Sequence, residues 1–533
     1  PAGTPYRVIA APTENLNIRV LTAVDLQAAI NSVANDGVIQ LAAGTYPAPT
    51  NGFQVINTNK SFTIRAENPG TVVLDGGGFK PIFRFYNDSL TSYSILFEGL
   101  KFSNGRTSTN GLAGGVSVEH ARATFVNCSF ENNKGEQSGT GGGAMVISQS
   151  SIVLIVDSTF NANTARNYGG AIALEVGSSA YIHHSSFTNN RTNLPGHPTF
   201  AAGGAIHVGN SKLRVSNSTF QSNQAGYVGG AIYAIGEWNN SGSDVIVANS
   251  LFSDNKAQND PSVTLSVPTE AGAFHAEDLT TAKIYYSRFI NNSAMVGGGV
   301  NLYRSIVEVN DSVFLGNQAT GPTSGNGFGG AMSAVSNDTG IDGSANRRTA
   351  NLTVRRTFIL GRYGSTGSAA RVGAGIYISG DGCRAFGGCG ISTLDGRAAN
   401  RANLTLDNVV LADLSANAST NSSGGAIVTD LANVTINSSM LLKNEAINYQ
   451  YARGGGLTAI RDSVVTLNDN FLVNNSAASD GGGIDLWCST LNASNNSFIQ
   501  NSLTDTRGGT AIATWLCKSS NFGFDANMAG TFQ

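Results

Sequence analysis

Residues 169–190 read GGAIALEVGSSAYIHHSSFTNN, and residues 203–223 read GGAIHVGNSKLRVSNSTFQSN. Both stretches begin with Gly-Gly-Ala-Ile, continue with runs in which apolar and polar residues alternate, and end with Phe and Asn three positions apart. A pattern that returns at a regular interval is typical of a repeat protein, in which each unit buries its apolar face against the next one. We therefore expect one stack of similar coils.

Two markers alternate along most of the chain. The first marker is a glycine pair, or a close variant, at the start of a short run. Most intervals between these pairs are about 26 to 34 residues. The pairs lie at Gly114, Gly142, Gly169, Gly203, Gly229, Gly272, Gly297, Gly329, Gly373, Gly424, Gly454 and Gly481. The Phe-x-x-Asn pairs between them are Phe130/Asn133, Phe160/Asn163, Phe187/Asn190, Phe220/Asn223, Phe252/Asn255, Phe289/Asn292, Phe314/Asn317, Phe471/Asn474 and Phe498/Asn501.

The alternating runs, such as AIALEV and AYIHHSSF, predict strands rather than helices. Coils stacked about 4.8 Å apart bury the inward residues against their copies above and below. The sequence predicts an all-β, right-handed parallel β-helix with three strands per coil. Glycine would supply corners with positive φ, Phe would fill the interior, and Asn would form an amide ladder at the next bend.

The N-terminal segment predicts a cap. Residues 24–34, VDLQAAINSVA, fit a short amphipathic helix with Asp25 as N-cap, and such a helix would cover the open end of the stack. With the SFTIRAENPGTVVLDGGG stretch (residues 61–78), this opening resembles the N-terminal part of secreted pectate-lyase-like β-helix proteins. We predict four regions: a cap and first rungs (1–60), β-helix (61–336), arginine-rich rungs with insertions (337–401) and C-terminal rungs (402–533).

The alternation of GGA[ILV] with FxxN over about residues 110 to 515 resembles the passenger domains of chlamydial polymorphic membrane proteins and related surface β-helices. That resemblance implies an adhesive β-helix at a cell surface, and it transfers no catalytic residue.

Composition and charge narrow the function classes. The net charge of −3 argues against a general nucleic-acid binder. Residues 337–401 are an exception, because this stretch contains nine arginines and only four acidic residues. We predict a basic patch formed by Arg347, Arg348, Arg355 and Arg356. No apolar run is long enough for a transmembrane helix. The chain begins at Pro1, as a processed secreted protein or an excised fragment would.

Cysteines and sequons suggest an extracellular glycoprotein. We predict disulfides between Cys383 and Cys389 and between Cys488 and Cys517, which suit an oxidising compartment; buried thiols in a reducing cell are the alternative. Asn-x-Ser/Thr sequons are moderately more frequent than composition predicts, and part of the excess would follow from the Asn ladder. The predicted glycosylation sites include Asn87, Asn127, Asn217, Asn310, Asn351, Asn403 and Asn433.

One face is rich in groups that sugar sites use. Alignment of the Gly-led strands gives two outward columns, and these carry hydrogen-bonding and aromatic residues on five successive rungs: Glu175, His207, Tyr233, His275, Glu277, Asn301 and Tyr303. This face would bind a glycan, with His or Tyr as proton-transfer groups if the protein is an enzyme. The alternative is a solvated sheet face, because outward residues are polar in any case.

Paired carboxylates are not evident. Glu175 and Glu277 would lie three rungs or about 14 Å apart, too far for glycoside hydrolysis, and Asp430 and Asp485 two rungs apart, near the upper limit. No metal or cofactor motif is present, so we expect neither.

These observations favour an extracellular, non-catalytic rod of a cell surface, wall or appendage that binds glycans or protein subunits and can self-assemble through its ends or sides. The second hypothesis is a carbohydrate-active enzyme of the same fold, a polysaccharide lyase or a glycoside hydrolase.

Overall fold

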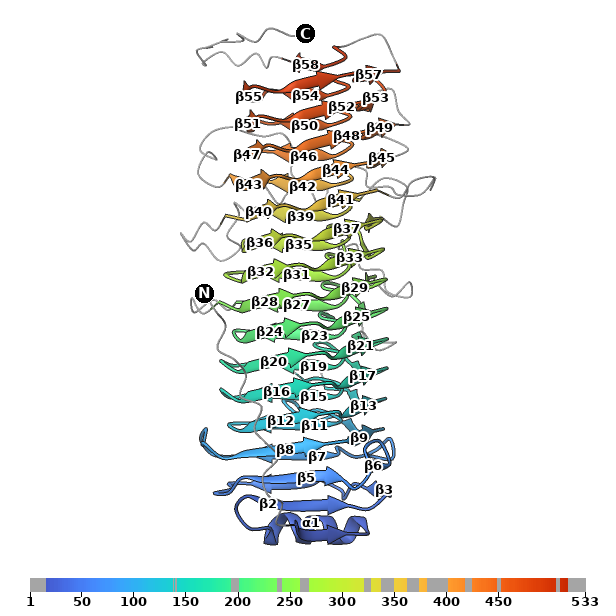
Figure 1. Ribbon diagram of the computed structural model, residues 1–533, viewed down its shortest axis with the longest axis vertical. Helices are drawn as coiled ribbons and strands as arrows, with labels where there is room; N and C mark the ends of the chain where they lie inside the picture. The colour runs from blue at the N-terminus through green and yellow to red at the C-terminus, as the bar shows by residue number, and fades with distance from the viewer. Residues whose placement is uncertain are drawn as a thin grey trace.

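The computed structural model describes residues 16–137, 139, 141–192, 201–236, 242–258, 268–320, 327–336, 349–361, 373–380, 401–417, 424–447, 452–504 and 509–515. These residues form a right-handed parallel β-helix, a rod of stacked coils with the N-terminal helix at one end (Figure 1). Parallel sheets run along the rod, and each strand pairs with its counterparts in the coils before and after it. The predicted fold is confirmed.

The strands that follow the glycine pairs form a 15-stranded sheet, called the Gly-Gly sheet below. Its strands in order are β4 (Phe53–Ile56), β7 (Phe83–Tyr86), β11 (Val116–Glu119), β15 (Met145–Ser148), β19 (Ile172–Leu174), β23 (Ile206–Gly209), β27 (Ile232–Ile235), β31 (Phe274–Glu277), β35 (Val300–Tyr303), β39 (Met332–Val335), β42 (Ile376–Ser379), β46 (Ile427–Asp430), β50 (Leu457–Ile460), β54 (Ile484–Trp487) and β58 (Ile512–Trp515).

The next strand of each coil belongs to a 16-stranded second sheet. Its strands are β1 (Leu16–Val20), β2 (Gly37–Leu41), β5 (Phe62–Ala66), β8 (Ser94–Glu98), β12 (Arg122–Val126), β16 (Ile152–Val156), β20 (Ser179–His183), β24 (Lys212–Ser216), β28 (Asp244–Ala248), β32 (Thr281–Tyr285), β36 (Ile306–Asn310), β40 (Asn351–Arg355), β43 (Ala402–Asp407), β47 (Ala432–Asn437), β51 (Val464–Asn468) and β55 (Thr490–Ser494).

A third sheet of 15 strands completes the coil. Its strands are β3 (Gly44–Pro47), β6 (Val72–Asp75), β9 (Leu100–Ser103), β13 (Ser129–Glu131), β17 (Thr159–Asn161), β21 (Ser186–Thr188), β25 (Thr219–Gln221), β29 (Leu251–Ser253), β33 (Arg288–Ile290), β37 (Val313–Leu315), β41 (Phe358–Leu360), β44 (Val410–Ala412), β48 (Met440–Leu442), β52 (Phe471–Val473) and β56 (Ser497–Ile499).

Many coils add a short fourth strand that the sequence did not predict. One such sheet contains β10 (Arg106–Thr107), β14 (Lys134–Gly135), β18 (Thr164–Ala165), β22 (Arg191–Thr192), β26 (Gln224–Ala225), β30 (Lys256–Ala257), β34 (Ser293–Ala294) and β38 (Gln318–Ala319). A second one contains β45 (Ser415–Asn417), β49 (Glu445–Ile447), β53 (Ser476–Ala477) and β57 (Ser502–Leu503). Strands of two or three residues are too short to show a period of two, so alternation alone could not find them.

A ladder of phenylalanines fills the interior. Successive rings of Phe102, Phe130, Phe160, Phe187, Phe220, Phe252, Phe289 and Phe314 stack with centroids 4.5 to 4.8 Å apart. All eight are fully buried. One residue per coil thus packs against its own copy above and below, which makes each coil depend on its neighbours.

The predicted asparagine ladder is present at the bend that follows. From Asn133 to Asn317, each amide nitrogen donates to the amide oxygen of the next coil at 2.9 to 3.0 Å. A second ladder joins Asn444, Asn475 and Asn501. The pairing Phe471/Asn474 was wrong, because Phe471 is 48% exposed and the buried residues of that coil are Leu472 and Asn475.

The two glycines of a pair have different tasks. The first, as in Gly169 with φ +60°, adopts the left-handed conformation that side chains disfavour. The second packs against the next coil: a Cβ on Gly170 would lie 2.1 Å from the carbonyl oxygen of Gly204. Glycine is thus favoured at both positions, although Ala271 takes the first position of its coil with φ +55°.

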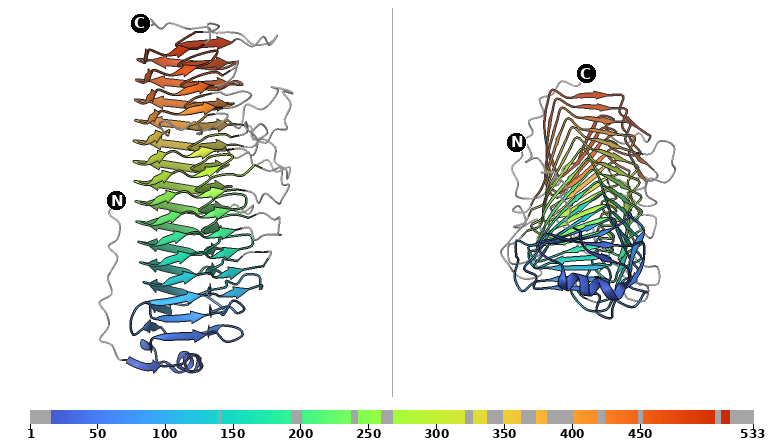
Figure 2. Two further views of the ribbon diagram at one scale, coloured as in Figure 1. Left: turned by 90° about the vertical axis from the view of Figure 1, so that its right-hand side faces the viewer. Right: turned by 60° about the horizontal axis from the view of Figure 1, so that its bottom comes forward.

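Helix α1 (Ala23–Ser32) covers the N-terminal end of the stack (Figure 2). Its buried residues Leu26, Ala29 and Ile30 join the core. The N-cap is Thr22 rather than the predicted Asp25, because Thr22 is the extended residue at the boundary whereas Asp25 is already in the first turn. The Thr22 hydroxyl donates to the Asp25 carboxylate at 2.6 Å.

Candidate functional site

The outward face of the Gly-Gly sheet is covered by the chain itself. The residues before the glycine pairs form a ladder of parallel bridges, called the lead-in ladder here, which consists of Tyr168, Ala202, Val228, Glu270, Val296 and Phe328. The glycine that follows lies directly on an outward side chain of the sheet, since a Cβ on Gly297 would lie 2.8 Å from the Cβ of Asn301. The outward residues therefore lie in a closed layer between the sheet and the lead-in ladder.

That layer contains the residues of the predicted glycan face. His207, Tyr233, His275 and Asn301 each expose 4% or less of their surface. They come from the consecutive strands β23, β27, β31 and β35, in adjacent register. The alternative of a solvated sheet face is wrong for these four residues, although their predicted outward direction and their proximity are correct.

The N-terminal part of the layer pairs a histidine with an acid. His207 Nε2 lies 3.1 Å from the carboxylate of Glu175, a residue directly after β19. The Tyr168 ring packs on the imidazole with centroids 4.6 Å apart, and Tyr233 packs on its far side at 5.3 Å. The second ring nitrogen of His207, Nδ1, is buried and has no hydrogen-bond partner among the described residues.

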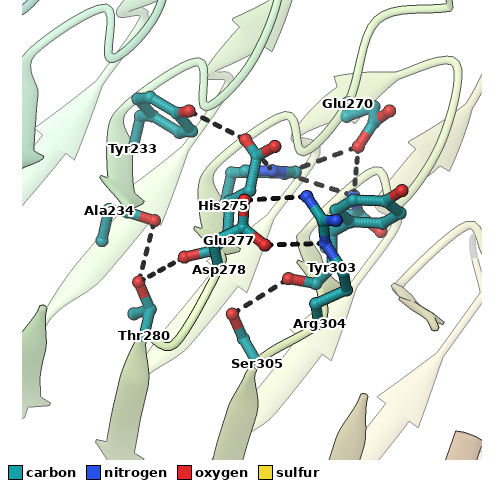
Figure 3. A network of polar contacts seen from close by, with 11 residues as sticks. Tyr233, Ala234, Glu270, His275, Glu277, Asp278, Thr280, Tyr303, Arg304 and Ser305 are labelled. Carbon is teal, nitrogen blue, oxygen red and sulfur yellow. Dashed lines mark hydrogen bonds and ion pairs between the residues drawn. The ribbon is translucent and has the colours of Figure 1, made fainter. Parts of the chain in front are cut away.

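The centre of the layer is a network around His275 (Figure 3). The Tyr233 hydroxyl donates to Glu277 Oε2 at 2.8 Å, and the same oxygen lies 3.5 Å from His275 Nε2. On the other side of the ring, Nδ1 lies 3.8 Å from Glu270 Oε2. His275 therefore separates two carboxyl groups that approach its two ring nitrogens.

Glu270 is the residue that sequence reasoning missed. Its coil carries Glu-Ala-Gly where the neighbouring coils have an apolar residue before the glycine pair. Its side chain points into the layer, where Asn301 Nδ2 donates to Oε2 at 2.7 Å and contacts His275 Nδ1 at 3.2 Å. An alignment of the corresponding position in every coil would have identified this acid, together with Asp480 in a later coil.

The two carboxyl groups differ in acidity. Burial raises the pKa of Glu270 to about 7, and the nearby charge of Glu277 adds to the rise against the opposing effects of His275 and Asn301. Burial also acts to raise the pKa of Glu277, but the contacts with His275, Tyr233 and Arg304 outweigh it and lower that pKa. Because the pKa of Glu270 is raised and that of Glu277 is lowered, there is a pH range below about 7 in which Glu270 carries a proton while Glu277 is ionised.

The rim of the layer reaches solvent. Glu277 keeps 22% of its side chain exposed, against 10% for Glu270. Tyr303 is half-buried, and the Arg304 guanidinium lies 4.5 Å from its ring centroid and pairs with Asp278 at 2.6 Å. Tyr168 and Tyr227 are half-buried as well. The rim thus combines tyrosine rings with the partly exposed acid Glu277 and the Arg304–Asp278 ion pair.

Glu270 and Glu277 form a pair of acids that the distance argument did not include. Glu175 and Glu277 are separated by three steps of the Gly-Gly sheet, as expected. Glu270 and Glu277 both approach one imidazole, so their oxygens are at most about 10 Å apart, within the range of glycoside-cleaving pairs. Among the described residues, no cluster of three or more His, Cys, Asp or Glu has the arrangement of a metal site.

The predicted basic patch is only partly described. Arg347 and Arg348 lie outside the described residues. Arg356 makes a two-pronged ion pair with Asp311 at 2.7 Å, which neutralises its charge locally. Arg355 lies at the end of β40 and is half-buried. A glycan site at this patch stays a prediction.

The cysteines are also only partly among the described residues. Cys383, Cys389 and Cys517 lie outside the described residues, so both predicted pairings stay predictions. Cys488 is disulfide-bonded. Cys128 is a buried free thiol, and burial raises its pKa to about 12, so it is unreactive at neutral pH.

Several sequons have structural tasks. Asn87 and Asn310 are 2% and 6% exposed, which leaves no room for a glycan on the folded chain. Asn403 and Asn433 donate their amide nitrogens to Asn351 and Asn403, in a ladder on the second sheet. Asn127 and Asn217 are exposed at corners. Glycosylation at the exposed sequons stays a prediction.

The comparisons with known proteins concern the fold. Residues 114–347 match the family model described as right handed beta helix region. No curated protein matches the chain. No helix in the described part of the chain has the length and apolar character needed to cross a membrane.

Similar solved structures include the catalytic unit of a GH87 alpha-1,3-glucanase from Streptomyces thermodiastaticus, with 10% identity, coverage of 93% of this chain and 70% of that one, and a TM-score of 0.38. The A-module of a mannuronan C-5 epimerase from Azotobacter vinelandii has 14% identity, coverage of 74% and 95%, and a TM-score of 0.36. An alginate lyase from Paenibacillus sp. has 14% identity, coverage of 56% and 93%, and a TM-score of 0.27. Similarity at this level says nothing about chemistry. The protein is a right-handed parallel β-helix protein whose residues 114–347 match the model of that region.

Proposed function

We propose that the protein is an extracellular glycoside hydrolase that cleaves a neutral polysaccharide, with Glu270 as general acid and Glu277 as general base. The observation that carries this proposal is the pair of carboxyl groups on either side of His275 whose pKa values move in opposite directions. Two titratable groups with such divergent environments are the pattern from which acid and base assignments follow in glycosidases.

The chemistry requires one proton donor and one acceptor. Protonated Glu270 gives its proton to the glycosidic oxygen as the bond to the anomeric carbon breaks. Ionised Glu277 takes a proton from the water that attacks this carbon, so that one water is added across the bond.

The surrounding residues support these roles. Asn301 fixes Glu270 through Oε2, and Tyr233 fixes Glu277 through its hydroxyl. His275 lies between the two acids and is a positioning residue for both. Two carboxyl groups held by fixed hydrogen-bond partners cost little reorganisation during the reaction.

The charge of the layer favours a neutral substrate. Glu175 and Glu277 contribute negative charge, and the cation of Arg304 is already paired with Asp278. A polyuronate would meet like charge here, which disfavours binding. The tyrosine rims provide flat apolar faces for the C–H groups of sugar rings.

Extracellular location is part of the proposal. Polysaccharides are substrates outside the cell, and disulfide-bonded Cys488 fits an oxidising compartment. The hypothesis of a purely adhesive rod lacks an explanation for a protonated acid beside an ionised one, because adhesion requires no buried pair of this kind.

The test combines product analysis with matched variants. We expect release of reducing ends from at least one neutral polysaccharide, with an alkaline limb of kcat/KM near pH 7 from Glu270. Glu270→Gln and Glu277→Gln should each lower kcat about 10²-fold to 10⁴-fold, whereas Glu308→Gln, on the second sheet, should have no effect. A protein that binds glycans without product release, or unchanged activity in Glu270→Gln, would support the rod and overturn the hydrolase.

A further inference from the structure

A second polar cluster lies on the same face, near the C-terminal end of the described rod. Arg453 and Asp480 precede the glycine pairs of β50 and β54 and are bridged to each other. Asp485 and Trp487 occupy the two outward positions of β54, and Trp515 is the register partner of Trp487 on β58. These five residues, called the Trp platform below, use the same positions of the coil as Glu270, His275 and Glu277.

The two tryptophans present large aromatic surface to solvent. Trp487 and Trp515 are 48% and 46% exposed, on strands that pair directly. The Arg453 guanidinium lies 4.9 Å from the Trp487 ring centroid and 5.6 Å from that of Trp515. One cation thus contacts two indoles while about half of each indole remains accessible.

Below the indoles, several buried polar atoms lack partners. Asp485 is fully buried, and neither of its carboxylate oxygens has a hydrogen-bond partner among the described residues. Nε of Arg453 and Oδ1 of Asp480 are likewise without one, although the two side chains form an ion pair at 3.5 Å. Native proteins leave few buried groups unsatisfied, and such a concentration indicates a site that a ligand and its waters complete.

We propose that the Trp platform is a second carbohydrate-binding site, for pyranose rings of a neutral polysaccharide. The C–H face of a sugar ring packs on an exposed indole, while its hydroxyls accept hydrogen bonds from Arg453 and donate through water to the buried acids. Asp480 and Asp485 are positioning residues that hold the guanidinium against the rings.

The charges at the Trp platform favour a neutral carbohydrate over an anionic one. The cation of Arg453 is offset by Asp480, and Asp485 lies beneath. An anionic sugar would therefore gain little from the arginine and would meet carboxylates. The site is independent of the reaction assigned to Glu270 and Glu277, because binding here needs no proton transfer.

The experiment measures binding rather than product release, in the wild type and in Glu270→Gln, in which the proposed hydrolysis is removed. Hexasaccharides of β-1,4-glucan, β-1,3-glucan and β-1,4-mannan, with hexagalacturonate as the acidic probe, are titrated into the full chain by calorimetry and tryptophan fluorescence. At least one neutral hexasaccharide should bind and change the fluorescence. Trp487→Ala and Trp515→Ala should each weaken binding at least tenfold, and Arg453→Met should weaken it as well.

Two controls separate the site from the fold and from the proposed reaction. Phe471→Ala removes an exposed aromatic residue of the same C-terminal rungs from the third sheet and should leave binding unchanged. Glu270→Gln should bind as the wild type does, whatever becomes of hydrolysis. Absence of binding to every neutral probe, binding of hexagalacturonate alone, or full affinity in Trp487→Ala with Trp515→Ala overturns the proposal.

Discussion

Glu270 changes the character of the layer it enters. The lead-in ladder is otherwise made of Tyr, Ala, Val and Phe, which close the outward face of the Gly-Gly sheet with apolar contacts. The Glu270 carboxyl at this place loses hydration, and burial raises its pKa to about 7. It lies beside the imidazole of His275 and accepts a hydrogen bond from the amide of Asn301. Asp480 is an acid at the corresponding position of a later coil, and there burial raises the pKa of the neighbouring Asp485.

These buried acids make stability depend on pH. Burial raises the pKa of Asp485 from 3.8 to about 7, with Asp480 adding to the rise against Arg453. The folded state binds more protons than the unfolded state between about pH 4 and 7, so stability falls as pH rises through this window. Asp485→Asn should remove this dependence, worth at most about 4 kcal/mol.

The measurement is the thermal midpoint of the wild type and Asp485→Asn at pH 4.5 and pH 7.5. The midpoint of the wild type should drop more between these values than that of the variant. Asp469→Asn, at an exposed corner, is the matched control and should follow the wild type. Equal slopes for wild type and Asp485→Asn would show that this acid is not buried in its protonated form.

Much of the candidate site could be predicted from residues, and the remainder depends on a feature that strand patterns do not report. Alternation gave the outward direction of His207, Tyr233, His275 and Asn301. Alternation did not indicate that these side chains are buried, because the residues that cover them belong to the lead-in ladder before each glycine pair and not to a strand of the sheet. Glu270 lies in this ladder rather than on a strand, and so the acid that completes the pair was not considered.

At the scale of the element, the stacked ladders provide cohesion. Phe220 is fully buried between Phe187 and Phe252, with centroids 4.7 Å from both. Phe220→Ala removes two ring contacts and leaves a cavity that neighbouring coils cannot fill without breaking their own stacking. We expect a loss of about 3 to 5 kcal/mol, spread over the adjoining coils.

Hydrogen exchange of the native protein can measure this loss coil by coil. Amides of β21, β25 and β29 should lose protection in Phe220→Ala, and those of distant coils should not. Phe471→Ala, at an exposed position of the same sheet, is the control and should cost under about 0.5 kcal/mol. A loss below about 1 kcal/mol for Phe220→Ala would contradict the register of the Phe ladder.

The same elements mark where sequence patterns suffice. A repeated Phe-x-x-Asn pair predicts an interior ring and an amide ladder, because only one register of the strand both buries the Phe ring and aligns the Asn with its copies in the neighbouring coils. In FLVNN (residues 471–475) two registers satisfy the pattern, and the chain buries Leu472 with Asn475 while Phe471 faces solvent. The choice is made by the Asn ladder, since Asn475 aligns with Asn444 and Asn501 whereas Asn474 would not.

At the scale of the whole molecule, the two proposed carbohydrate sites lie on one face of the rod. The Gly-Gly sheet runs through β31, which carries His275 and Glu277, and six strands later through β54, which carries Asp485 and Trp487. At the strand spacing of a parallel sheet this separation is about 29 Å. A long polysaccharide can therefore occupy both sites at once, whereas a short oligosaccharide cannot.

This geometry predicts a dependence on substrate length. A chain held by the Trp platform has a raised effective concentration at Glu270, because its second binding event is intramolecular. Trp487→Ala with Trp515→Ala should raise KM for the polymeric substrate about tenfold or more with little change in kcat, since the acid and base remain in place. For a trisaccharide or tetrasaccharide of the same linkage, the same double variant should show the kinetics of the wild type. Phe471→Ala should match the wild type on both substrates, and a KM unchanged on polymer would mean that the two sites do not share one chain.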